Sequence, residues 1–132
     1  MAKKFKFTVK VYYEDTDAGG VVYYANYLKF LERARSEAIY SLGCSNTGLL
    51  DRYGILLIVK SCNIEYKKPA KFEDKLDIVS EVSSFTKTSL ILKQNILRDN
   101  ELISEADIHL VTVDKNGKPS KIPNELKQNL EK

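Results

Sequence analysis

The chain has 132 residues, of which 43% are hydrophobic and 30% are charged, and its formal net charge is +3. This length and composition are typical of one globular domain with one core, spanning residues 1–132. The mild positive charge does not indicate nucleic-acid binding, although it would help to attract an anionic small ligand. No stretch is apolar for long enough to span a bilayer, and no apolar segment follows the basic amino terminus, so we expect a cytoplasmic protein.

Two kinds of hydrophobic spacing divide the first half of the chain. Alternating apolar residues over Lys4–Tyr13 predict a strand. After a loop, apolar residues recur at every third or fourth position, which predicts a helix capped by Asn26 and stopped by Gly43. A second, short helix is expected over Asn46–Tyr53.

Four further strands are predicted, each with alternate apolar residues on one face: Ile55–Tyr66, Lys75–Ser84, Thr88–Leu97 and Leu102–Val113. The inward face of the first includes Ile58 and Cys62, and that of the last includes Leu102 and Ala106. A run of strands after a helix favours an antiparallel sheet. We therefore expect an α+β fold in which a curved antiparallel sheet of about five strands wraps around one long central helix.

The cysteine and histidine content argues against a metal site. Cys44 and Cys62 form no C-x-x-C pair, which predicts structural free thiols. His109 is the only histidine, and it alternates with the inward-facing residues of the last strand. A position on the sheet surface or in a subunit contact is favoured for it over catalysis, and no zinc-type ligand spacing is present.

The segment Y-Y-E-D-T-D-A-G-G-V-V-Y-Y-A-N-Y-L-K-F-L-E-R-A-R, Tyr12–Arg35, resembles the signature of the hotdog-fold acyl-CoA thioesterases. It is most similar to the 4-hydroxybenzoyl-CoA thioesterase family and its YbgC-like branch, which is associated with the Tol–Pal system. A weaker similarity continues over Ser61–Ile78 and as far as Ile122-Pro123. The resemblance implies a sheet wrapped around the helix, subunits that pair edge to edge, here in a homotetramer built from dimers, and thioester hydrolysis that needs neither metal nor separate cofactor.

The resemblance also implies site residues. Asp17, the second aspartate of D-x-D, stands at the family's catalytic carboxylate. The residues expected around the thioester follow it: Gly19, Gly20, Val21, Val22, Tyr23, Tyr24 and Tyr27. General chemistry agrees, because thioester hydrolysis needs a carboxylate that attacks the carbonyl or activates water, and N–H donors at the oxyanion. A helix amino terminus supplies such donors, glycines admit a ligand to the backbone, and tyrosine rings exclude water.

Simpler interpretations stand beside these. Asp17 could serve only as a turn residue, and Asp15 fits a structural partner that holds the loop. Glu32, on the central helix, is the second candidate carboxylate, although it also fits a helix surface. Tyr24 stands where YbgC-like members commonly have histidine, so a histidine base is excluded there, whereas the 4-hydroxybenzoyl branch carries tyrosine.

Three lysines around a proline lie in the second similar segment: Lys67, Lys68 and Lys71. They fit either a solvated loop or a binding site for the phosphates of coenzyme A.

Two function classes remain open. One is an acyl-CoA thioesterase, with acyl carrier protein as an alternative donor, and the other is a non-catalytic hotdog protein that binds an acyl thioester or a protein partner.

Overall fold

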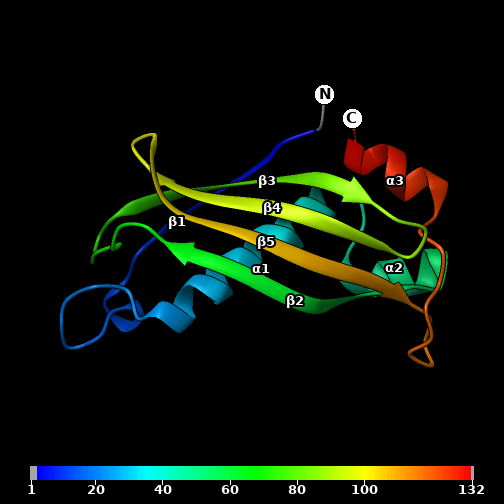
Figure 1. The fold of residues 1–132 in the computed structure, drawn as a ribbon, viewed down its shortest axis with the longest axis horizontal. Coiled ribbons are helices and arrows are strands. Elements are labelled where there is room, and N and C mark those ends of the chain that lie inside the picture. Colours follow the sequence, from blue (N-terminus) through cyan, green and yellow to red (C-terminus); the bar gives the residue numbers. More distant parts are fainter. Residues whose placement is uncertain (1–2, 132) are drawn as a thin grey trace.

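The computed structural model describes residues 3–131, which form one five-stranded antiparallel sheet with three α-helices (Figure 1). The elements in chain order are β1 (Phe5–Lys10), α1 (Tyr24–Ser41), α2 (Asn46–Tyr53), β2 (Leu56–Tyr66), β3 (Lys75–Phe85), β4 (Ser89–Arg98), β5 (Glu101–Val113) and α3 (Asn124–Glu131). The strands lie in the order β1-β3-β4-β5-β2, and α1 crosses one face of the sheet. The predicted α+β architecture is confirmed. No helix in the described range is long and apolar enough to cross a membrane.

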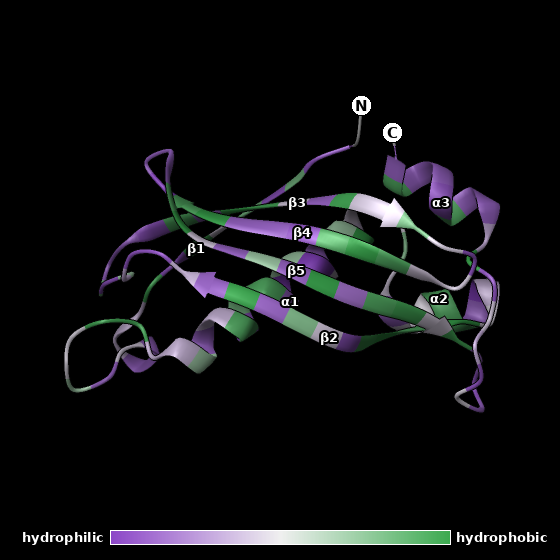
Figure 2. Ribbon diagram, in the orientation of Figure 1, coloured by the Kyte–Doolittle hydropathy of each residue, from purple (hydrophilic) through white to green (hydrophobic). Residues whose placement is uncertain are grey.

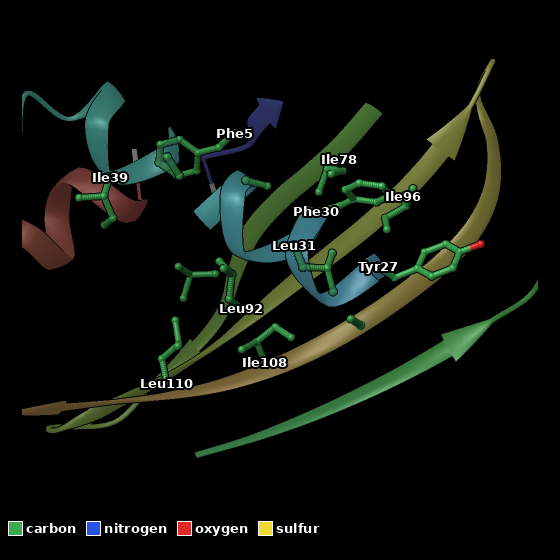
Figure 3. Packing of buried hydrophobic residues seen from close by; sticks show 14 of the residues in the cluster. Phe5, Tyr27, Phe30, Leu31, Ile39, Ile78, Leu92, Ile96, Ile108 and Leu110 are labelled. Atoms are coloured by element: carbon green, nitrogen blue, oxygen red, sulfur yellow. The ribbon is translucent and has the colours of Figure 1, made fainter. Parts of the chain in front are cut away.

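The core lies between α1 and the inner face of the sheet. Phe30 and Leu31 of α1 are fully buried, and they meet Ile78, Ile96 and Ile108 from the three central strands (Figure 3). Along β5 hydrophobic and hydrophilic residues follow one another, as Figure 2 shows. This alternation buries one face of the sheet and leaves the other to solvent, because successive side chains of a strand point to opposite faces.

Two β-bulges correct the predicted faces. A register shift between Val59 and Ser61 reverses the alternation within β2, so Ile58 pairs with Val111 on the outer face while Val59 and Cys62 face inward. In β5 the shift falls at Ile103, which is fully buried. Leu102 therefore pairs with Leu97 on the outer face, and its predicted grouping with Ala106 is wrong.

The beginning of α1 is also corrected. The helix starts at Tyr24, two residues before the predicted cap, because the Asn26 side chain donates instead to the Asp15 carbonyl oxygen at 2.9 Å. The preceding strand ends at Lys10 rather than Tyr13, which is 78% exposed and lies in a turn of 3-10 helix. Gly43 ends the helix as predicted, and its φ of 80° suits glycine.

Strand β2 forms a sheet edge, and none of its residues is buried. The central helix packs mainly against β1 and β3, whereas β2 has α2 as its helical neighbour. Ile58 and Val59 are 46% and 45% exposed, and Cys62 is exposed and free. The inner face of β2 is therefore only partly covered within this chain.

Candidate active site

The loop between β1 and α1 is fixed by Asp15. Its carboxylate accepts a hydrogen bond from the Tyr12 backbone N–H at 2.9 Å. Its carbonyl oxygen accepts from the Tyr23 N–H at 3.0 Å and from the Asn26 side chain. These bonds engage both the side chain and the backbone of Asp15. The structural role predicted for this residue agrees with them.

Asp17 lies two residues further along, in a narrow turn closed by a bridge between Thr16 and Val22. The Gly19 N–H donates to Asp17 Oδ1 at 2.8 Å, and the Gly20 N–H donates to the Asp17 carbonyl oxygen at 3.0 Å. A Cβ at Gly19 would lie 3.2 Å from Oδ1, a tight contact that glycine avoids. The Asp17 side chain is exposed, so one carboxylate edge is held by the turn while the group stays open to solvent.

The amino terminus of α1 opens directly after this turn. Tyr23 occupies the capping position without a side-chain hydrogen bond to the helix. Among the described residues, the N–H groups of Tyr24 and Ala25 have no hydrogen-bond acceptor. Unpaired N–H groups at the positive end of a helix dipole attract a negatively polarised oxygen.

Three tyrosine rings border this helix entrance. Tyr23 and Tyr24 lie with ring centroids 4.9 Å apart, and Tyr66 of β2 meets Tyr24 edge to face at 6.4 Å. The Tyr66 hydroxyl donates to the Tyr24 carbonyl oxygen at 3.2 Å. The neighbouring Tyr24 phenol raises the pKa of Tyr23, and the charge of Asp17 acts in the same direction. The three rings thus form one aromatic cluster at the helix entrance.

Tyr27 has a different position from the one predicted. It is 3% exposed, and its hydroxyl accepts a hydrogen bond from the Ala70 N–H at 2.9 Å. Its ring packs edge to face against Tyr66, with centroids 5.0 Å apart. Burial raises the pKa of Tyr27. Tyr27 therefore supports the Tyr66 ring from the protein interior and does not itself line the exposed helix entrance.

The predicted lysine loop is adjacent to the motif. Val22 donates its N–H to the Ala70 carbonyl oxygen at 2.8 Å, and Val21 forms a bridge with Lys71. From the other side, Arg98 of β4 donates to the Pro69 carbonyl oxygen at 2.9 Å and forms an ion pair with Asp74 at 2.8 Å. The fold therefore places the family-like segment Ser61–Ile78 against the family-like segment Tyr12–Arg35.

The three lysines differ in their partners. Lys67 forms ion pairs with Glu65 at 3.4 Å and Glu105 at 3.7 Å, and Lys68 pairs with Glu101. Lys71 has no carboxylate partner among residues 3–131, and its ammonium is exposed. Of the three, Lys71 is therefore the most available to an anion.

The other candidates lie away from the helix entrance. Glu32 is two turns further along α1 and accepts a hydrogen bond from Ser36 at 3.2 Å. His109 is on the outer face of the sheet, opposite Ser61 and Ile91. Within the described part of the chain, no group of three or more histidine, cysteine or acidic side chains could hold a metal.

Two contributors were missed from the sequence. Tyr66 is separated from Tyr24 by 42 residues and Arg98 from Asp74 by 24, so no local pattern connects them. The only available signals were a tyrosine that ends a strand and an arginine beside a predicted turn. Their roles follow from tertiary pairing.

A curved sheet around one helix, with a carboxylate turn at the helix entrance, defines a hotdog-fold protein of the thioesterase type. The sequence matches the thioesterase-like superfamily over residues 11–130, and the chain belongs to this superfamily.

Similar proteins agree with this assignment. The chain is 40% identical over 124 residues to an acyl-CoA thioesterase YbgC of Haemophilus influenzae, covering 93% of this chain and 91% of that protein. It is 42% identical over 111 residues to an acyl-CoA thioester hydrolase YbgC of Escherichia coli, covering 83% and 82%. Among solved structures, a probable thioesterase from Bartonella henselae superposes with a TM-score of 0.85 at 31% identity, covering 92% of this chain and 100% of that one.

Proposed function

We propose that this chain is an acyl-CoA thioesterase that hydrolyses a thioester to a free acid and coenzyme A. The observation that carries the proposal is the exposed Asp17 carboxylate beside a helix entrance whose first N–H groups are open. Family membership and the thioesterase activity named for the similar proteins support it. The substrate is an acyl-CoA, with an acyl carrier protein thioester as the alternative donor.

The N–H groups of Tyr24 and Ala25 would receive the thioester carbonyl oxygen, which gains negative charge as the carbon becomes tetrahedral. Asp17 then acts in one of two ways. It adds to the carbonyl carbon and forms an anhydride that water cleaves, or it removes a proton from the water that adds. In both cases the carbon–sulfur bond breaks, and coenzyme A leaves as a thiol after it gains a proton.

Asp17 is the only carboxylate in this proposal that combines exposure with a place at the helix entrance. Asp15 is engaged by the loop backbone, and Glu32 lies eight residues into α1. The neutral phenol of a tyrosine is a poor proton acceptor, in contrast to the imidazole of a histidine. Tyr24 therefore contributes its backbone N–H and its ring.

Coenzyme A would lie over the loop that contains Lys71, with Lys67 and Lys68 at its border. Lysine binds phosphate as a point charge. Catalysis needs no metal and no separate cofactor in this mechanism.

We further propose that the protein is cytoplasmic and forms a homotetramer built from dimers. The oligomer is supported by β2, which leaves an uncovered sheet edge. Light scattering of the purified protein tests the oligomer, and a monomer with full activity would contradict it.

The decisive experiment measures release of free coenzyme A thiol from short, long and aromatic acyl-CoAs. Asp17→Asn keeps an oxygen for the Gly19 N–H and removes the charge, so kcat should fall about a hundredfold or more while circular dichroism is unchanged. Asp15→Asn is the matched control, because it removes a charge two residues away and keeps an acceptor for Tyr12. Equal effects of the two substitutions would reject Asp17 as the reacting carboxylate.

Two further outcomes are informative. Activity should survive dialysis against a strong chelator, and a loss restored by zinc or magnesium would reject the metal-free mechanism. If no thioester is hydrolysed but acyl-CoA binds, the non-catalytic alternative replaces the enzyme.

A further inference from the structure

A cavity of about 270 Å³ lies beyond the helix entrance, between the second half of α1, the inner face of the sheet and α2. Its lining is mainly apolar and includes Ile39 of α1, Leu49 of α2, Val59 of β2, Leu92 of β4 and Leu110 of β5. The cavity lies on the side of α1 where β2 is only partly covered. Its mainly apolar lining with a few polar groups is the composition of a small-molecule site, although its volume lies at the lower limit for one.

The polar groups of the cavity are engaged with one another or with the core. Ser36 donates to Glu32, and Asn46 donates to Ser36 at 3.1 Å. Arg35 donates to the Gln94 side-chain oxygen at 3.0 Å. The remaining surface offers aliphatic contact, so an unsubstituted hydrocarbon suits the cavity better than a hydroxylated ring.

The position of the cavity along α1 sets the length of the group that reaches it. Glu32 is eight residues after Tyr24 and Ile39 is fifteen, so along the axis of α1 the cavity lining begins about 12 Å and ends about 22 Å from Tyr24. With carbon–carbon bonds of about 1.5 Å in a zigzag chain, about ten carbons are needed to span 12 Å. A benzoyl group or a short acyl chain held at Tyr24 would end before the cavity.

We propose that this cavity holds the distal part of an aliphatic acyl chain, which makes medium-to-long-chain acyl thioesters of about ten carbons or more the preferred substrate class. This inference rests on the proposed function, since it takes Tyr24 as the position of the thioester. Burial of each methylene in the cavity lowers the free energy of the bound acyl chain. The preference should therefore appear as a rise of kcat/KM with chain length, and Val59 is a specificity-determining residue for it.

Val59 and Ile58 provide a matched pair for the test. They are adjacent, branched at Cβ and about equally exposed, but Val59 faces Leu110 across the inner face whereas Ile58 faces Val111 on the outer face. A larger side chain at Val59 shortens the cavity, and the same side chain at Ile58 does not. Any general effect on the β2 edge is shared by both variants.

The experiment compares kcat/KM for butanoyl-, decanoyl-, tetradecanoyl- and benzoyl-CoA in the wild type and in Val59→Leu, Val59→Phe, Val59→Trp and Ile58→Trp. We expect the wild type to favour tetradecanoyl-CoA over butanoyl-CoA by at least tenfold, with decanoyl-CoA, which only reaches the cavity, between the two. The Val59 series should lower the tetradecanoyl value progressively, by tenfold or more at tryptophan, while the butanoyl value stays within about twofold. Ile58→Trp should keep the wild-type profile. The graded series keeps the test valid if the tryptophan variant does not fold.

A flat chain-length profile, a preference for benzoyl-CoA, or equal profiles of Val59→Trp and Ile58→Trp would overturn the inference. The first two results still leave a thioesterase, so they do not touch the proposed function. Calorimetric titration of the Asp17→Asn variant with tetradecanoyl-CoA and with coenzyme A gives a readout without turnover. Equal affinity for the two ligands would also overturn the inference, because the chain would then contribute nothing to binding.

Discussion

The hydroxyl of Tyr27 accepts a hydrogen bond from the backbone N–H of Ala70 at 2.9 Å, and both residues are buried. This bond connects the first turn of α1 to the loop that carries the candidate lysines. The helix entrance and the loop between β2 and β3 are thereby held as one unit, with Val22 paired to the same loop.

The first prediction concerns this bond. Tyr27→Phe leaves the buried Ala70 N–H without its partner, which costs about 1–3 kcal/mol of unfolding free energy. KM for acyl-CoA should rise, because the loop of Lys71 loses its tie to α1. Urea unfolding and steady-state kinetics measure the two effects. Tyr40→Phe is the control at an exposed position of the same helix, and equal stability of the two variants would contradict the role of Tyr27.

The second prediction isolates the backbone donor at position 24. Tyr24 is the first residue of α1, where proline is favoured, and Tyr23 has φ −61° and ψ 131°, which a residue before proline readily adopts. Tyr24→Pro therefore removes the N–H without breaking the helix. Its kcat should fall about 10²–10³-fold below that of Tyr24→Ala, which loses the ring but keeps the donor. Equal kcat values in the two variants would exclude this N–H from the oxyanion site.

Tyr24→Phe completes this series. It loses only the hydroxyl, so most of the activity should remain in the same thiol-release assay. A thousandfold loss in a folded Tyr24→Phe variant would mean that the hydroxyl takes part in the chemistry. Asp17 would then not be the only reacting group.

The third prediction separates the lysines. Lys71→Ala should raise KM severalfold with kcat within about twofold, because a contact with the coenzyme A phosphates binds ground and transition states alike. Lys68→Ala should have the smaller effect, because Lys68 already pairs with Glu101. The increase in KM should shrink at high salt, where exposed charges are screened. An unchanged KM in the triple alanine variant of Lys67, Lys68 and Lys71 would assign all three to a solvated loop.

The sequence predicted the elements better than their faces. The three- and four-residue spacing of Phe30, Leu31 and Ala34 identified α1, because a buried helix stripe leaves a regular pattern. The bulges near Val59 and Ile103 were not predictable, because an inserted residue changes the pairing partner without changing local composition. Ile58 and Leu102 were assigned to the wrong face for this reason.

In the candidate site too, local features were predictable from the sequence and tertiary contacts were not. Asp17, Gly19 and Gly20 lie within four residues of one another, and their local turn follows from residue type. The start of α1 was misplaced because Asn26, a frequent capping residue, is recruited by Asp15 across the loop. Tyr66 reaches the site only through the pairing of β2 with β5, which no local pattern encodes.

Gln94 carries the last prediction, because it is a fully buried polar side chain on the inner face of β4, among Leu92 and Ile96. Its amide nitrogen donates to the Leu31 carbonyl oxygen at 3.1 Å and to the Ser80 hydroxyl at 2.9 Å. Its oxygen accepts from Arg35, whose pKa is lowered because burial disfavours the charged guanidinium. Gln94 is therefore the hydrogen-bonding centre between α1 and the sheet.

Gln94→Leu retains a similar volume but leaves the Arg35 guanidinium and the Leu31 carbonyl without this partner. We expect a loss of roughly 1.5–3 kcal/mol in unfolding free energy, measured in urea, because a partly buried charged donor loses its acceptor. The double variant Arg35→Met with Gln94→Leu should be more stable than Gln94→Leu alone, since both partners then become apolar. A Gln94→Leu variant as stable as the wild type, or a double variant whose losses simply add, would mean that the two side chains are not energetically coupled.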